Sequence, residues 1–87
     1  MNVSEVASMS DAGTGFGSRL RHARRAKGLT RNQLARLLGV HERTVARWEL
    51  QQQVPHEQHL FRLAGELGVR PVWLFDGIPP MYGSRPR

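Results

Sequence analysis

Apolar residues recur at helical spacing in several separate stretches of this chain, and no stretch alternates apolar and polar residues as a half-buried strand would. The first stretch begins near residue 14. Phe16, Leu20 and Ala23 share one face of it, with arginines between them, and Gly28 is placed to end it. This pattern predicts an amphipathic helix.

Two short helices are predicted next. Thr30 and Gln33 have the spacing of a capping box, in which the hydroxyl accepts a backbone N–H and the glutamine side chain reaches back to the cap residue. Gly39 is expected to stop this second helix after about two turns. The third helix, over 41–49, has an apolar side and a basic side.

Proline and glycine mark the remaining helices. Pro55 is expected at the start of a fourth helix and Gly68 at its end, because proline suits the first turn and glycine the residue after the last. A fifth short helix is predicted over 71–75, followed by Asp76 and Gly77. Five short helices in 87 residues predict an all-α fold, a compact bundle that forms one domain.

The ends of the chain lack this periodicity. Residues 1–13 are rich in small and polar residues and are predicted to be a disordered leader to a domain over 14–77. Residues 78–87 hold three prolines and are predicted to be a tail. Three residues of the tail are expected to be exposed and to form a dimer or partner contact: Ile78, Met81 and Tyr82.

Cysteine and hydropathy point to a cellular compartment. The chain has no cysteine and so forms no disulfide, which points to a reducing compartment. The leader has no apolar run long enough for a signal peptide or a membrane span. We therefore expect a cytoplasmic protein.

Positive charge is concentrated in one segment. Between Ser18 and Arg47 there are nine basic residues and one acidic residue, whereas the rest of the chain has four basic and six acidic residues. Such a segment either forms a surface for a polyanion or is a solvated helix surface. The nine basic residues are Arg19, Arg21, Arg24, Arg25, Lys27, Arg31, Arg36, Arg43 and Arg47.

The second and third helices are joined by too few residues to run antiparallel. Ala35 is expected where they approach most closely, and Gly39 is expected in the left-handed conformation that turns the chain. Val45 and Trp48 then point back into the angle between the two helices. A small residue, a glycine and a branched apolar residue, spaced four and six residues apart, form a pattern that few sequences meet by chance.

This pattern resembles the Cro and phage-repressor type of helix-turn-helix regulators, the XRE family. The resemblance runs from about Phe16 to Gly77 and implies a lambda-repressor-like fold and a sequence-specific DNA-binding transcriptional regulator. It also implies that the third helix enters the major groove and that the start of the second abuts a phosphate. The motifs that carry it are Gly17-Ser18-Arg19-Leu20-Arg21, Lys27-Gly28-Leu29-Thr30, Leu34-Ala35, Leu38-Gly39-Val40, Trp48-Glu49, Leu63-Ala64, Leu67-Gly68-Val69 and Trp73-Leu74-Phe75-Asp76-Gly77.

The resemblance assigns base contacts to His41, Glu42, Arg43 and Arg47, and backbone contacts to Arg31 and Thr44. An arginine fork can donate two hydrogen bonds to guanine, which suits the two arginines of the third helix. Glu42 either accepts a hydrogen bond from cytosine or only stabilises the helix N-terminus. His41 contacts a phosphate, caps the helix or does neither.

The family often pairs an arginine of the first helix with the glutamate that ends the third. The matching residues are Arg24 and Glu49, which are expected to form a partly buried, structural ion pair. The chain departs from the family at Arg31, which replaces a common glutamine, and at His41, which replaces a serine or threonine cap. The loop 50–53 lacks the glycine of many relatives, which leaves the third helix free to run on.

Other chemistry is not supported by spacing. His56 and His59 are three residues apart, whereas a metalloprotease helix needs histidines four apart, and no third ligand is evident. The glycines of 13–17 follow no strand and are interpreted as a flexible lead-in. No catalytic triad is apparent. We therefore expect no enzyme activity, no cofactor and no bound metal.

The expected partner is duplex DNA carrying a palindromic operator, read by a homodimer whose half-sites lie about 34 Å apart. The alternative is a protein-interaction role, such as an antitoxin that neutralises a toxin and also represses its own operon.

Overall fold

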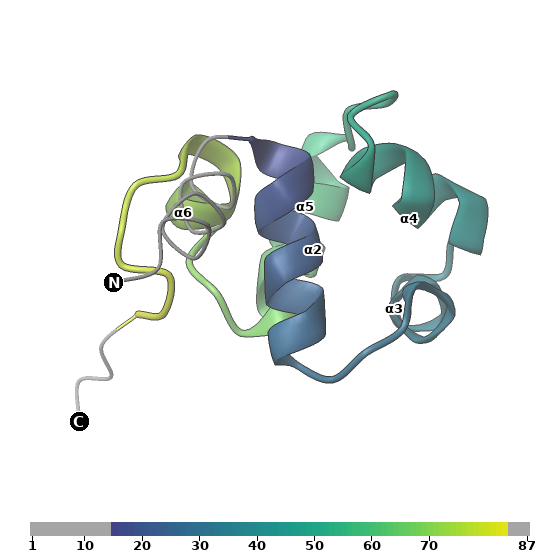
Figure 1. Cartoon of the computed structure of the whole chain (residues 1–87), viewed down its shortest axis with the longest axis horizontal. Coiled ribbons are helices and arrows are strands. Elements are labelled where there is room, and N and C mark those ends of the chain that lie inside the picture. The colour runs from purple at the N-terminus through teal and green to yellow at the C-terminus, as the bar shows by residue number, and fades with distance from the viewer. Residues whose placement is uncertain (1–14, 84–87) are drawn as a thin grey trace, which may run out of the picture.

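The computed structural model describes residues 15–83, and the predicted leader 1–13 lies outside this range, as do residues 84–87. Within it the chain forms five helices and no strand, which confirms the all-α prediction. Numbered as in Figure 1, they are α2 (Phe16–Ala26), α3 (Arg31–Leu38), α4 (Glu42–Glu49), α5 (Glu57–Leu67) and α6 (Pro71–Asp76).

Helix α2 occupies the middle of the bundle. Figure 1 shows it between the α3 and α4 pair on one side and α6 on the other, and it packs on both α4 and α6. Helix α5 closes the bundle through contacts with α3 and α6. All five helices contribute to one apolar core, whose largest fully buried side chains are Trp48, Leu20, Leu34, Leu63, Leu67, Leu74 and Val45.

The ends of the helices follow the local sequence signals with one exception. The capping box at Thr30 is present, with both reciprocal hydrogen bonds formed to Gln33. The prediction that Pro55 starts the fourth helix is wrong, because α5 begins at Glu57 with His56 as its N-cap. Pro55 precedes the helix and is buried, so it contributes to tertiary packing and not to the first turn of α5.

Residues 78–83 return to the bundle after α6. The backbone N–H of Arg70 donates to the Met81 carbonyl at 2.9 Å, and its guanidinium donates to the Pro80 carbonyl at 3.1 Å. Met81 packs against the core, so the expectation that it is exposed is wrong. Ile78 and Tyr82 are exposed, as expected.

No helix within residues 15–83 combines the length and the apolar character that a membrane crossing requires.

Candidate nucleic-acid interface

A tight turn sets the angle between α3 and α4. Gly39 takes the left-handed conformation, with φ 74°, which a residue with a Cβ adopts at a cost. The Val40 N–H then donates to the Ala35 carbonyl at 3.0 Å. Ala35 and Val45 are both buried in the core between the helices. These positions confirm the predicted geometry of the turn.

Helix α4 has two faces, as its sequence predicts. Val45 and Trp48 are buried, while Arg43 and Arg47 are exposed on the other side. The outer face, together with the start of α3, forms a concave recess of about 680 Å³. It is lined by Asn32, His41, Glu42, Arg43, Thr44, Ala46 and Arg47. The structure therefore gathers every α4 residue assigned to DNA, and leaves Arg31 outside the recess.

The two residues with open alternatives are placed at the start of α4. His41 occupies the N-cap position, but its side chain makes no capping hydrogen bond. Of the roles considered for His41, side-chain capping is therefore excluded. Glu42 lies exposed in the first turn, where a carboxylate is favoured by the helix dipole.

Asn32 is a recess residue that sequence reasoning missed. It is exposed on α3, one position after the residue assigned to a phosphate. A polar residue in the first turn of the second helix was the available signal. Its proximity to α4 depends on the angle of the turn.

The predicted ion pair between Arg24 and Glu49 is confirmed. The Nε and Nη2 atoms of Arg24 donate to the two carboxylate oxygens at 2.6 and 3.2 Å, a bidentate arrangement. A third bond from Arg24 reaches the Leu29 carbonyl at 2.8 Å. This arginine therefore ties α2 both to the end of α4 and to the loop before α3.

Arg31 also binds Glu49, which the sequence did not indicate. Its Nε–H donates to Oε1 of the carboxylate at 3.1 Å. The side chain of Arg31 is 34% exposed, whereas that of Glu49 is fully covered. Arg31, which was assigned to a DNA phosphate, is therefore already paired with a carboxylate inside the protein.

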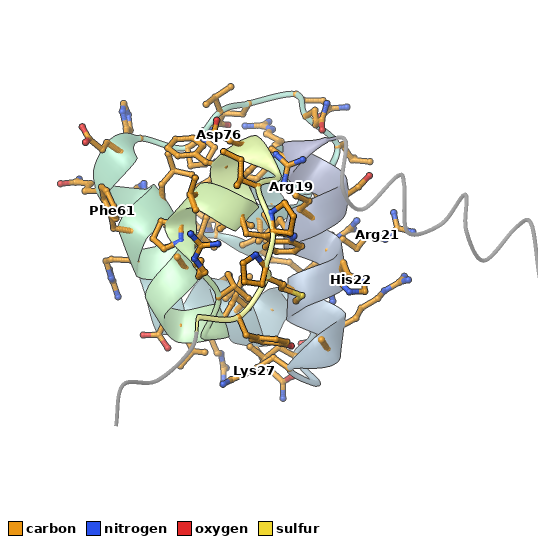
Figure 2. The ribbon with its side chains drawn as sticks, turned by 90° about the vertical axis from the view of Figure 1, so that its left-hand side faces the viewer. Arg19, Arg21, His22, Lys27, Phe61 and Asp76 are labelled. Atoms are coloured by element: carbon orange, nitrogen blue, oxygen red, sulfur yellow. The ribbon has the colours of Figure 1, made fainter. Side chains whose placement is uncertain are left out.

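The basic segment does not form a single surface, because Arg19 and Arg24 are buried. The guanidinium of Arg19 donates to the carbonyls of Leu74 and Phe75 at 2.8 and 2.6 Å. Burial lowers the pKa of Arg19, and the negative charge of Asp76 partly opposes this shift. Figure 2 shows Arg19 beside α6, whereas Arg21 projects from the outer side of α2. Two of the nine basic residues are therefore structural.

The start of α2 lies against the end of α4. Gly17 is buried, and a Cβ atom added to it would lie 2.8 Å from the Glu49 carbonyl carbon. The side-chain oxygen of Gln51 accepts the Gly17 N–H at 2.9 Å. The interpretation of 13–17 as a flexible lead-in is wrong for Phe16 and Gly17, which form the start of α2. The contact with Glu49 requires that Gly17 has no side chain.

Helix α4 does not run on past Glu49. Gln51 adopts a positive φ of 59°, in place of the glycine usual in the family, and the Gln52 N–H donates to the Arg47 carbonyl at 2.9 Å. The hydrogen bond from Gly17 helps to hold Gln51 in this conformation.

Of the two histidines at the start of α5, His59 packs against the core, whereas His56 is exposed at the N-cap. The ring of His59 lies on the Trp48 ring, with 5.5 Å between centroids. Among residues 15–83, no group of three or more His, Cys, Asp or Glu side chains could hold a metal ion.

Comparisons with known proteins agree on the family. A family model described as Helix-turn-helix matches residues 20–74. The crystal structure of the P22 c2 repressor in complex with synthetic operator 9T is similar, with a TM-score of 0.72 and 25% identity over 75% of this chain and 98% of that one. The solution structure of the P22 c2 repressor DNA-binding domain is also similar, with a TM-score of 0.70 and 25% identity over 74% of this chain and 84% of that one. The search of curated proteins gave no match. This chain therefore belongs to the helix-turn-helix family, as a DNA-binding transcription regulator of the Cro and phage-repressor type.

Proposed function

We propose that this protein represses transcription by binding a palindromic operator as a homodimer, with α4 in the major groove. The observation that carries the proposal is the recess on the outer face of α4, which gathers Arg43, Arg47 and Asn32 around exposed polar surface. A second support is the similar P22 c2 repressor, whose structure is a complex with a synthetic operator. The recess and the similarity to the P22 c2 repressor are independent observations, and each supports the proposal.

Base contacts are proposed for four residues of the recess: His41, Glu42, Arg43 and Arg47. Arg43 and Arg47 are four residues apart, one helical turn, and both are exposed. Each can donate two hydrogen bonds to the O6 and N7 atoms of a guanine. For Glu42 we propose a hydrogen bond accepted from a cytosine amino group in the same groove, the alternative being that it only stabilises the N-terminus of α4.

Backbone contacts are proposed for Thr44 and Arg31. The N–H groups of Arg31 and Asn32 precede the first intrahelical hydrogen bond of α3, so the helix itself offers them no acceptor. Phosphate oxygens suit such a helix start. A charged guanidinium beside these donors adds affinity for any sequence.

Two copies of the chain are proposed because a single small module rarely supplies the affinity of a specific site. The exposed tail residues Ile78 and Tyr82 are our candidates for the contact between copies. The same two residues favour the second candidate function, in which the chain also binds a toxin as its antitoxin. Both functions place the protein in the cytoplasm, on the nucleoid when bound.

Selection from a pool of random duplexes tests the proposal directly. We expect enrichment of a palindromic consensus, since two identical copies read two identical half-sites. Recovery of no sequence above background would reject operator binding. A non-palindromic consensus would reject the homodimer while retaining base readout.

Two alanine variants then separate base readout from backbone binding. We expect Arg43→Ala to weaken operator binding by about 1 to 3 kcal/mol and to change binding to scrambled duplex little. Arg31→Ala should weaken both duplexes by similar factors and lower the salt slope by about one. The opposite pattern would mean that the recognition face is assigned wrongly.

A further inference from the structure

The carboxylate of Glu49 holds two arginines with different surroundings. Arg24 and Arg31 both donate to it, and its Oε1 atom accepts from each at 3.2 and 3.1 Å. The side chain of Arg24 is 10% exposed and that of Arg31 is 34% exposed, while Glu49 has no exposed side-chain surface. One carboxylate and two guanidinium groups leave a net positive charge, and the more accessible of the two arginines is Arg31.

The place of Arg31 in α3 is unfavourable without Glu49. It is the first residue of the helix, and the first turn contains no acidic residue. A cation at the positive end of a helix dipole is destabilised. A buried carboxylate from α4 supplies the negative charge that the helix lacks. A phosphate at the same helix start would supply a second.

The direction of the hydrogen bond leaves the rest of the guanidinium available. Arg31 uses its Nε–H toward Glu49, and its Nη groups make no hydrogen bond to any residue of 15–83. An arginine that is already held in place loses less side-chain freedom when it binds a ligand. The Nε–H of Arg31 is therefore engaged by the protein, and its Nη groups keep donors with which an anion can form hydrogen bonds.

We propose that Glu49 is a positioning residue for DNA binding, which holds Arg31 ready to bind a backbone phosphate. The inference rests on the proposed function, because it needs Arg31 to contact DNA. It adds that the family's structural ion pair extends, in this chain, to a residue of the interface. If Glu49 only neutralised the charge of Arg31, it would weaken phosphate binding, and its removal would tighten DNA binding. If Glu49 positions Arg31, its removal should weaken DNA binding.

A double-mutant cycle measures this role. We expect Arg31→Ala to weaken binding to scrambled duplex about tenfold in the wild-type background, and about twofold or less in a Glu49→Gln background. Arg36→Ala is the matched control, because Arg36 is an exposed arginine of the same helix with no ion pair to Glu49. Its effect should be the same in both backgrounds. An equal effect of Arg31→Ala in both, or tighter binding by Glu49→Gln, would overturn the proposal.

A measurement on the wild type avoids the risk that Glu49→Gln fails to fold. In the free protein, the heteronuclear NOE of the Arg31 Nε–H should match that of the rigid backbone, whereas the Arg36 Nε–H should be mobile. Equal mobility of the two side chains would overturn the proposal. An ordered Arg31 in a protein with no salt-dependent DNA affinity would instead reject the proposed function and keep the internal ion pair.

Discussion

Gly17 in the first turn of α2 lies against the main-chain carbonyl of Glu49, the last residue of α4. The same glutamate binds Arg24, further along α2, through its carboxylate. Helix α4 is therefore held against α2 at two points by one residue, once through its main chain and once through its side chain. This double attachment fixes the helix that carries the proposed recognition face.

The contact at Gly17 predicts a large effect of a single methyl group. We expect Gly17→Ala to lower the free energy of unfolding by about 1 to 3 kcal/mol, because the added Cβ has backbone atoms in its way. Gly65→Ala is the matched control, since a Cβ added to that helical glycine would meet no atom within 4 Å outside its chain neighbours and its own helix backbone. The control should gain up to about 1 kcal/mol from helix propensity. Urea denaturation of both variants checks the difference, and equal stability would contradict the close approach.

The crossing of α3 and α4 predicts that Ala35 does not tolerate a larger side chain. Ala35 is 2% exposed and lies in the core. Ala35→Leu should lower the free energy of unfolding by about 1 to 3 kcal/mol through overpacking. Ala26→Leu, at the exposed end of α2, should change it by less than about 0.5 kcal/mol. A melting temperature unchanged by Ala35→Leu would refute the turn geometry.

Arg19 should affect stability and leave the salt dependence of DNA binding unchanged. Its guanidinium holds the last carbonyls of α6, so Arg19→Met should cost about 1 to 3 kcal/mol of stability. Arg21→Met, on the exposed side of α2, should have little effect on stability. A lower salt slope for Arg19→Met would show that Arg19 reaches DNA, contrary to its burial.

Duplex affinity should fall steeply with salt. About four to eight phosphates neutralised per dimer, each contributing about 0.9 to the slope of log affinity against log salt, give the expected range. Titration of a scrambled duplex at several salt concentrations measures this slope. A slope near zero would mean that the exposed arginines serve another partner.

The amino-acid sequence by itself determined the helices and the turn between α3 and α4. The capping box at Thr30 and the left-handed Gly39 depend on residues a few positions apart, and the apolar face of each helix follows from spacing along the chain. The ion pair between Arg24 and Glu49 could also be predicted from the sequence, through its resemblance to the family.

Only the tertiary structure decided which cations are surface and which are core. Arg19 and Arg21 belong to the same basic segment, yet Arg19 is buried with its guanidinium on carbonyls of α6, while Arg21 is exposed. The bond from Arg31 to Glu49 and the bond from Gly17 to Gln51 likewise join residues 18 and 34 positions apart. Such contacts depend on how separate helices cross, and helical periodicity describes each helix alone.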